Sequence, residues 1–376
     1  MWQKSKNIYH LVNSILANIY YGFPSKKLCV IGVTGTDGKT TTSAIIHHIL
    51  NSAGVNTSMI SSVGAIIDGK QYDLEFHRTT PAAWRTQRFI KMAKDVSSKH
   101  VVLEVTSHAL DQNRVWGIDF EVGVLTNVTN EHLDYHRTYE NYLNTKAKLL
   151  RKAKIAVFNK DDSSYKTINN KLSTISSKKV ITYGIGKDSD VNPKNFPFKT
   201  KLFGEFNKYN ILAAVGVCKA LGLKDEQIRQ AVESFRAPIG REELVYKNSF
   251  SVMIDFAHTP NALNQLLSSI KPQTQGNLIH VFGSAGERDY KKRPEMGEIS
   301  SKYADKIFLT AEDPRSEKVE RIIEEIEKGI NSKKPEVFKI QNRQEAINKA
   351  IKLAKKGDFV VITGKGHEKI NELRKR

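Results

Sequence analysis

The segment Val33–Ser43, VTGTDGKTTTS, combines the residue types that bind phosphate groups. Glycines let a backbone approach an anion closely, a lysine reaches the outer phosphates of a nucleotide, and the next hydroxyl binds magnesium. Val33 stands where the standard G-x-x-x-x-G-K-[ST] motif has its first glycine, so the pattern here is G-T-D-G-K-T. A glycine-rich turn without a ligand is the alternative. The phosphate-binding roles fall on Gly35, Gly38, Lys39 and Thr40.

A carboxylate interrupts one of the apolar runs that predict buried strands. In VVLEVTSH, Glu104 stands among valines and a leucine. An unpaired carboxylate in such a place is costly, and a magnesium ion would offset the cost. A structural glutamate in a salt bridge is the alternative.

Polar residues also follow four apolar runs in the second half of the chain. SVMIDFAHTPNA places Asp255 and His258 after one run, and VFGSAGERD, FLTAEDPR and VITGKGHE follow the same plan. Ligands of open α/β sheets bind beyond the carboxyl ends of the strands. These loops therefore predict the mouth of a binding cleft.

One lysine occupies an apolar position of a predicted helix. In TYENYLNTKAKLL the apolar stripe is Tyr139, Tyr142, Leu143, Leu149 and Leu150, and Lys146 fills its vacant i+7 position. Burial disfavours the charged form of an amine. A neutral amine can react with carbon dioxide to give a carbamate, which is an oxygen ligand for a hard metal. A lysine that extends its ammonium into water is the alternative.

Parallel sheets flanked by helices must position these residues, because apolar runs alternate with helix-length segments. We expect an α/β fold, with a joint at FRAPIGRE, where Pro238 and Gly240 break a helix. The predicted parts are an N-terminal helical appendage (1–26), a central domain (27–237) and a C-terminal domain (238–376). The predicted strands are Leu28–Val33, Val101–Val105, Val122–Thr126, Ile155–Phe158, Val252–Asp255, Leu278–Phe282, Lys306–Thr310 and Phe359–Thr363.

The composition excludes several classes of protein. No run of about 18 apolar residues occurs, so we expect no membrane insertion. The N-terminus lacks the features of a signal peptide, and two cysteines make no disulfide framework, so we expect a cytoplasmic protein. The net charge is +19, but its basic residues are scattered and no nucleic-acid motif accompanies them, so we expect no nucleic-acid partner.

Together these motifs resemble the Mur ligase family, and most closely its MurE-like branch. The resemblance covers about Lys27 to Glu368 in matching order. It rests on GVTGTDGKTTTS, LEVTSHALDQNRV, LTNVTNEHLDYH, GEFNKYNILAA, DFAHTPNAL, FGSAGERDYKKRPEMG, EDPR and GKGHE. It implies a central P-loop ATPase domain with a mostly parallel sheet and a C-terminal Rossmann-like domain that binds an amino acid.

The resemblance also implies a reaction. A carboxylate acceptor attacks the γ-phosphate of ATP, which gives an acyl phosphate and ADP. The amine of an amino acid then attacks the acyl carbon, and phosphate leaves. The site must neutralise charge between two anions, for which the family uses magnesium at two sites.

Residue roles follow from the same resemblance. Phosphate contacts would come from Gly35, Thr36, Asp37, Gly38, Lys39, Thr40 and Thr41, and other nucleotide contacts from Asn207, Asn210, Arg241, Asp255 and His258. Thr40 and Glu104 would hold one magnesium, and His132 with carbamylated Lys146 a second. The acceptor would contact Thr79, Thr80, Ser107 and Arg114, and the amino acid Arg288, Asp313, Arg315, Gly364 and Glu368.

Two departures from the family bear on the substrates. Asp313 replaces the asparagine of the family's DNPR loop, whereas Arg315 is retained. Arg315 favours meso-diaminopimelate, whose second carboxylate it could pair with, over lysine; the added acid could instead favour a purely cationic side chain. We expect a muramoyl-dipeptide-like acceptor.

The second departure is that only 26 residues precede the central domain, where MurE-like enzymes have a UDP-binding domain of roughly a hundred residues. We therefore expect an acceptor without UDP, weak affinity for it, or a partner chain that supplies this surface.

Two other functions stay open. A ligase similar to folylpolyglutamate synthetase is one, although RTTP, TSH and EDPR argue against it. A non-catalytic nucleotide-binding subunit is the other, and the joint presence of Glu104, His132 and Lys146 argues against that.

Overall fold

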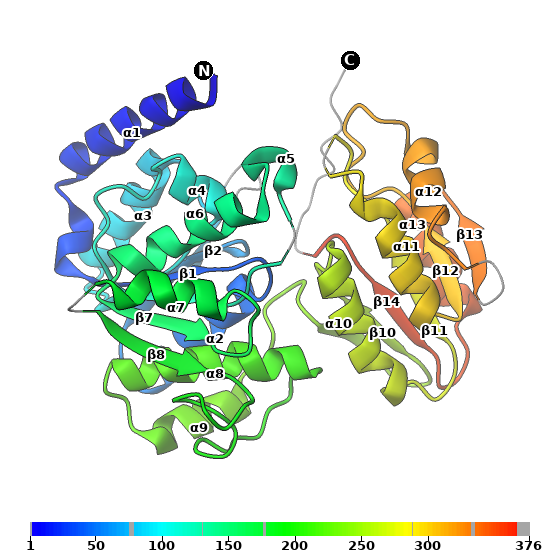
Figure 1. Ribbon diagram of the computed structural model, residues 1–376. Helices are drawn as coiled ribbons and strands as arrows, with labels where there is room; N and C mark the ends of the chain where they lie inside the picture. The colour runs from blue at the N-terminus through cyan, green and yellow to red at the C-terminus, as the bar shows by residue number, and fades with distance from the viewer. Residues whose placement is uncertain are drawn as a thin grey trace. The chain divides into compact units, whose positions relative to one another are not determined.

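The computed structural model describes residues 2–74, 79–129, 131–175, 178–287, 289–331 and 335–366. The chain forms two compact units, coloured blue to green and yellow to red in Figure 1. The first comprises 1–130, 136–201 and 206–236, and the second 131–135, 202–205 and 237–376.

The first unit contains a sheet in the order β4-β3-β2-β5-β1-β6-β7-β8 among the described residues. The six strands from β2 to β8 in that order run parallel, and the β2–β3–β4 edge is antiparallel. The strands are β1 (Cys29–Thr34), β2 (Thr57–Ser61), β3 (Gly64–Ile67), β4 (Lys70–Tyr72), β5 (His100–Glu104), β6 (Phe120–Leu125), β7 (Ile155–Asn159) and β8 (Lys179–Tyr183).

Helices cover both faces of this sheet (Figure 1). Apolar side chains of α3, α4 and α6 form one core cluster with β1, β5 and β6, and α2 packs on β2 and β5 from the other side, next to α9. The helices are α1 (Trp2–Tyr21), α2 (Lys39–Ser52), α3 (Ala83–Asp95), α4 (Ser107–Asp111), α6 (Tyr139–Lys152), α7 (Tyr165–Ser173), α8 (Glu205–Ala220) and α9 (Asp225–Ser234). A short 3-10 turn spans Pro24–Lys27, and α5 (Leu133–His136) lies where the chain passes between the units.

The second unit contains a sheet in the order β13-β12-β11-β14-β10-β9 within the described ranges, parallel except for β9. Its strands are β9 (Glu243–Lys247), β10 (Ser251–Ile254), β11 (Leu278–Phe282), β12 (Lys306–Leu309), β13 (Glu336–Lys339) and β14 (Phe359–Ile362). Helices α10 (Pro260–Ile270), α11 (Lys292–Tyr303) and α12 (Val319–Glu327) cover one face, and α13 (Arg343–Leu353) covers the other.

The α/β fold predicted from the sequence is confirmed, and each predicted strand is found with ends shifted by at most two residues. The sequence interpretation missed β2, β3, β4, β8, β9 and β13. These strands are short or rich in polar residues, as in TSMIS and KVITY, so they lack the continuous apolar run that marks a fully buried strand. Within the described residues no helix is long and apolar enough to cross a membrane.

Candidate active site

The phosphate loop follows β1 and leads into α2. Gly38 precedes the first residue of α2 with φ 81°, and Gly35 has φ 152°. A Cβ atom at Gly35 would collide with Thr126 Oγ1, and one at Gly38 with Asn210 Oδ1. Both positions therefore require glycine, because of the backbone angle and because other groups approach closely. The loop meets the N-terminus of α2, which is where an anion is favoured.

The neighbouring strand β6 fixes the shape of this loop. Thr34 pairs with Leu125, so the residues after both strands lie side by side. The amide of Asp37 donates to Asn127 Oδ1 over 2.9 Å, and Thr126 Oγ1 donates to the carbonyl of Asp37 over 2.6 Å. Thr36 Oγ1 accepts from the amide of Thr129 over 3.0 Å. The loop is thus held in place by the protein itself.

Lys39 points back over the loop. Its Nζ donates to the carbonyl oxygen of Thr36 over 2.7 Å, and the side chain is half-buried. An ammonium held there carries the positive charge that a triphosphate needs beside the loop amides. Thr41 lies in the first turn of α2 and is also half-buried.

Glu104 lies directly beside the start of the loop, because β5 pairs with β1 and places Glu104 opposite Val33. Its carboxylate is 1 % exposed. Thr40 Oγ1 lies 3.2 and 3.1 Å from its two oxygens, and the amide of Ser62 donates to Oε2 over 2.9 Å. Among the described residues, Glu104 forms no salt bridge with a basic side chain, so its contacts do not favour the alternative of a structural salt bridge.

A hard cation would fit the pair of Thr40 and Glu104. A hydroxyl and a carboxylate are oxygen donors of the kind that Mg²⁺ prefers, and they meet at the end of the phosphate loop. Within the part of the chain that the structure describes, the buried carboxylate has hydroxyl and amide partners and no cationic one, so its negative charge is available to a cation.

Lys146 lies in the first unit and touches the same loop. Thr138 caps α6 by accepting from the amide of Asn141, and the buried face of the helix includes Lys146, which is 1 % exposed. Its Nζ donates to the carbonyl of Gly35 over 2.6 Å and lies 4.4 Å from the centre of the Tyr142 ring. The alternative of an ammonium in water is therefore wrong.

Asn207 and Asn210 meet the other side of the loop from α8. Both are buried, Asn210 Nδ2 donates to Asn207 Oδ1 over 2.9 Å, and Asn210 Oδ1 accepts from Thr42 Oγ1 over 3.3 Å. Helix α8 thus brings two amide side chains to the first turn of α2.

The predicted acceptor residues form a connected group next to Glu104. Thr79 Oγ1 accepts from Ser62 Oγ over 3.0 Å, and Thr80 Oγ1 donates to the carbonyl of Glu104 over 3.0 Å. Arg114 is buried and donates to the carbonyl of Thr80 over 2.7 Å. Ser107 bonds to His136 Nε2 over 3.0 Å. Thr80 and Arg114 are thus in positions that hold the loop after β5, whereas Thr79 is more accessible.

In the second unit, Asp255 follows β10. Its carboxylate accepts from the amide of Glu242 over 2.8 Å and from that of Ala257 over 2.7 Å. Burial raises the pKa of Asp255, although the nearby Arg241 opposes the change. Arg241 stacks on Phe256, with its guanidinium carbon 4.1 Å from the ring centre.

His258 and His132 share one acidic partner, Glu131, which belongs to the second unit as they do. His258 Nε2 lies 3.6 Å from Glu131 Oε1, and His132 Nε2 lies 3.8 Å from Oε2. Burial would raise the pKa of Glu131, but His132, His258 and Lys292 outweigh it and hold that pKa well below its usual range. The predicted second magnesium pair is thus divided, with His132 in the second unit and Lys146 in the first.

The loops after β11, β12 and β14 meet at one edge of the second sheet. Asp313 Oδ1 pairs with Lys365 over 2.8 Å, and the amide of Gly286 donates to the carbonyl of Asp313 over 2.9 Å. A Cβ atom at Gly364 would lie 2.7 Å from Glu312 Oε2. Arg315 is half-buried in the same loop, with φ 54°. Arg288 and Glu368 lie outside the described residues.

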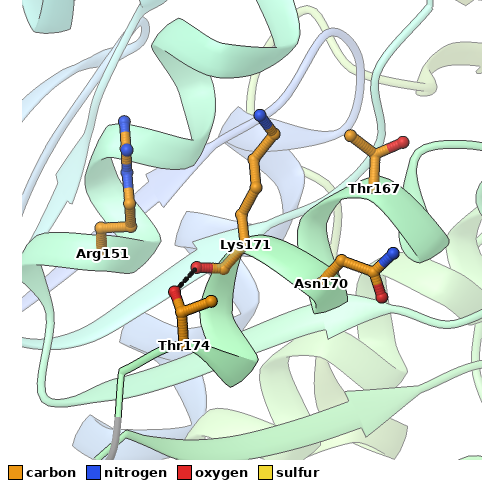
Figure 2. A pocket seen from close by; sticks show the side chains of 5 residues that line it. All are labelled: Arg151, Thr167, Asn170, Lys171 and Thr174. Atoms are coloured by element: carbon orange, nitrogen blue, oxygen red, sulfur yellow. Dashed lines mark hydrogen bonds between the residues drawn. The ribbon is translucent and has the colours of Figure 1, made fainter.

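One hollow on the surface lies away from these residues. Figure 2 shows Arg151, Thr167, Asn170, Lys171 and Thr174 around it, with Thr174 Oγ1 donating to the carbonyl of Lys171 over 3.1 Å. Among the described residues that line it, none is a site residue predicted from the sequence. Its lining is basic and hydroxylic, without a carboxylate, so it adds nothing to the candidate site.

Several residues of the site were missed by sequence reasoning. Ser62 positions Glu104, and Asn127 with Thr126 shapes the phosphate loop. Glu131 joins two histidines, and Glu312 is a buried carboxyl whose pKa is raised by burial. Glu131 sits beside His132, and Glu312 opens the EDPR motif, so both had a signal in the sequence. Ser62 and Asn127 had none, because common residue types reveal such a role only through their neighbours.

The fold and these contacts define a class of protein: a two-unit α/β enzyme with a phosphate loop and a buried carboxylate beside it. Models of two protein families match the chain, the Mur ligase middle domain over residues 33–218 and the Mur ligase, glutamate ligase domain over residues 240–366.

Similar proteins agree with these matches. The UDP-N-acetylmuramoyl-L-alanyl-D-glutamate--2,6-diaminopimelate ligase of Aquifex aeolicus is 40% identical over 95% of this chain and 76% of its own length. The corresponding ligase of Clostridium botulinum is 35% identical over 94% of this chain and 76% of its own length. The chain belongs to the Mur ligase family. It is an ATP-dependent acid–amino-acid ligase that forms ADP, as the resemblance implied.

Solved structures show the same fold. A UDP-N-acetylmuramoyl-L-alanyl-D-glutamate--2,6-diaminopimelate ligase superposes with a TM-score of 0.64 at 30% identity, covering 92% of this chain and 74% of that one. Folylpolyglutamate synthase of Mycobacterium tuberculosis has a TM-score of 0.76 at 18% identity, covering 94% of this chain and 92% of that one. The second likeness shows the fold alone.

Proposed function

We propose that this ligase joins a diamino acid, meso-diaminopimelate in preference to lysine, to the carboxylate of a muramoyl-dipeptide-like acceptor. The observation that carries the proposal is the meeting of Thr40, Glu104 and Lys146 at one phosphate loop. Relatives that are 35–40% identical are named for diaminopimelate, and this supports the choice of amino acid. Likeness to folylpolyglutamate synthase extends only to the fold, so the folate alternative has weaker support.

The phosphate loop would hold the ATP. The loop from Gly35 to Thr41 and the N-terminus of α2 would surround the phosphates, and Lys39 would supply a positive charge. The amides of Thr36 and Asp37 donate to Asn127 and shape the loop. Asn207 and Asn210 would contact the base or ribose from the first unit, and Asp255, Arg241 and His258 from the second. A rigid loop favours the transfer because its donors need no rearrangement when the transition state forms.

Magnesium would be held by Thr40 and Glu104, and a second ion by His132 and a carbamate on Lys146. When bound, these ions neutralise charge between the γ-phosphate and the acceptor carboxylate. Carbamate formation adds carbon dioxide to the neutral Lys146 amine and releases one proton. The N–H that remains can still donate to the carbonyl of Gly35, so the carbamate fits the contact that the structure shows.

The acceptor carboxylate would attack the γ-phosphorus, the bond to the bridging oxygen would break, and ADP would leave. The neutral amine of the amino acid would then attack the acyl carbon, phosphate would leave with the bonding electron pair, and the nitrogen would release one proton to water. Thr79 would contact the acceptor together with Ser107, whereas Thr80 and Arg114 hold the chain on that side of Glu104.

The amino acid would bind at the loops of the second unit. Arg315 would pair with a carboxylate of the diamino acid, and Asp313 with an ammonium, together with Arg288, Gly364 and Glu368. Asp313 already pairs with Lys365, which moderates its added negative charge. This reduces the pull of Asp313 toward a purely cationic side chain and supports diaminopimelate over lysine.

A phosphate-release assay tests the proposal. Meso-diaminopimelate, lysine and glutamate are crossed with UDP-muramoyl-dipeptide, its UDP-free fragment and a folate, with ATP and Mg²⁺ throughout. We expect the largest release with meso-diaminopimelate and a muramoyl-dipeptide. Release only with folate and glutamate would favour the folate alternative, and no release with any pair would favour a non-catalytic subunit.

The same assay tests whether the UDP group contributes to the binding of the acceptor. The KM values of the UDP-linked acceptor and of its UDP-free fragment show how much affinity UDP contributes. A tenfold lower KM with the UDP-linked acceptor would correspond to about 1.4 kcal/mol of extra binding. We further propose that the ligase acts in the cytoplasm, where ATP is supplied.

A further inference from the structure

Helix α1 attaches to the first unit through polar side chains. Ser14 and Asn18 are fully buried. Ser14 Oγ donates to the carbonyl of Asn113 over 2.8 Å, Asn18 Nδ2 donates to that of Trp116 over 2.8 Å, and Asn7 Nδ2 donates to Asp111 Oδ2 over 3.1 Å. These bonds to one loop fix which face of the helix is turned inward.

The opposite face of α1 is apolar. Its large side chains are between 47% and 73% exposed, and we call them the α1 stripe: Ile8, Tyr9, Val12, Leu16, Ile19 and Tyr20. Their spacing places them on one side of a helix with 3.6 residues per turn. Trp84 of α3 extends the stripe, since its ring lies 5.6 Å from that of Tyr20 and its Nε1 donates to Asn13. A globular helix normally turns such a face toward the core, so this one is arranged for a partner.

Charge indicates what that partner is. Residues 2–27 contain Lys4, Lys6, Lys26 and Lys27 and no aspartate or glutamate, in a chain of net charge +19. A second copy of the chain would bring the same positive charge to the stripe, and like charges oppose such an interface. An anionic surface complements it.

The shape and the aromatic residues of the stripe favour a lipid surface. The stripe is one side of a single 20-residue helix, about 30 Å long, so it presents a ridge rather than a groove. Tyr9, Tyr20 and Trp84 have apolar rings with a polar edge, and such rings favour the boundary between lipid headgroups and acyl chains. We propose that α1 docks this ligase reversibly on the surface of an anionic lipid bilayer, with the α1 stripe in the headgroup region.

The α1 stripe would lie on the membrane without crossing it. The inference does not depend on which amino acid or acceptor the ligase uses, and α1 contributes no residue to the candidate active site. Membrane binding and ligation can therefore fail separately, and the two are measured in different assays.

Vesicle flotation tests the inference. The full chain is floated with vesicles of phosphatidylcholine alone and of phosphatidylcholine with phosphatidylglycerol. Val12→Ser/Leu16→Ser removes apolar area from the stripe, and Lys26→Gln/Lys27→Gln removes charge. Val245→Ser/Leu353→Ser is the matched control, since these side chains are 49% and 38% exposed and belong to the second unit.

We expect the wild type and the control to float only with the anionic vesicles, and less so at high salt. The Val12/Leu16 variant should partition at least about tenfold more weakly, because it loses two large apolar side chains. Its unfolding temperature should match that of the wild type. The inference would be overturned if the Val12/Leu16 variant floated as well as the wild type, or if its unfolding temperature were lower. It would also be overturned if the wild type did not float or floated with phosphatidylcholine alone. Dimerisation of the wild type that the variant abolishes would point to a second copy of the chain and would overturn it too.

Discussion

The two units differ in the partners of their buried charged side chains. In the first, Glu104 and Lys146 are each 1 % exposed, and their partners are hydroxyls, amides and a carbonyl of the phosphate loop. In the second, Glu131, Glu312 and Asp313 lie among other charged groups, and the pKa values of Glu131 and Glu312 are shifted. Hydrogen bonds within the first unit hold its phosphate loop, which we propose binds phosphate and metal. We propose that the charged groups of the second unit bind the amino acid, whose own charges they complement.

Replacing Lys39 of the phosphate loop should have the largest effect on ATP turnover. Lys39→Ala takes away the charge that faces the outer phosphates, and we expect ATP turnover to fall about 10³-fold. Lys356→Ala, an exposed lysine of the second unit, is the control and should leave turnover unchanged. If Lys39→Ala turned over ATP at the normal rate, the nucleotide site would not be in the first unit.

Replacing Lys146 tests whether its buried amine is converted to a negatively charged carbamate that binds metal. Lys146→Ala should lower ligation at least about 10²-fold, because a metal ligand is lost. Lys148→Ala, on the same helix but half-exposed near Asp111, is the matched control. Wild-type activity should fall in buffers free of carbon dioxide and return with bicarbonate. A Lys146→Ala ligase at full speed would remove the carbamate from the proposal.

Replacing Arg293 tests whether this side chain holds together the loops that follow β11 and β12 in the second unit. It is fully buried, and its guanidinium donates to Glu317, Glu325 and the carbonyl of Ala285, so it ties the loops after β11 and β12 together. Arg293→Met should cost about 3 kcal/mol of stability, because it removes the buried partner of Glu317 and leaves Glu325 with the exposed Arg321. Urea unfolding measures this.

The control for that change is Arg321→Met. Arg321 pairs with the same Glu325 but is 72% exposed, so its loss should cost less than about 0.5 kcal/mol. Equal costs for the two arginines would show that burial does not strengthen this pair. The Arg293 variant should also have a higher KM for the amino acid, with a smaller change in the KM for ATP.

The smallest effect concerns pH. The folded-state pKa of Glu131 lies below its usual value of 4.5, so its ionised form stabilises the fold above pH 4.5, and this contribution is lost as the pH falls through the folded-state value. Asp255 and Glu312 have raised pKa values, so their protonation has the opposite sign and stabilises the fold as the pH falls.

Thermal unfolding from pH 7 to about pH 3.5 measures the contribution of Glu131. Glu131→Gln should be less stable than the wild type at pH 7, and the difference should shrink in acid. Glu298→Gln, an exposed residue of α11, is the control. If the difference in stability between the two proteins stayed constant over this pH range, the ionised carboxylate of Glu131 would not contribute to stability.

The α/β class could be predicted from the sequence, and the phosphate-loop motif, Glu104 and Lys146 could be singled out from it. Each has a local signal: alternating apolar runs, glycines before Lys-Thr, a carboxylate in a strand, and a lysine at an apolar helix position. The register of β5 beside β1 then explains why Glu104 reaches Thr40 although 64 residues separate them in the chain.

Other features of the site depend on tertiary contacts that the sequence does not reveal. Ser62, Asn127 and Arg293 act through partners that are distant in the chain, and serine, asparagine and arginine are common in other roles. Helix α1 likewise turns Ser14 and Asn18 inward, because buried hydrogen bonds to the loop at Asn113 and Trp116 fix its orientation. Periodicity identifies the two faces of a helix, but which face is buried depends on the partners that the fold brings to it.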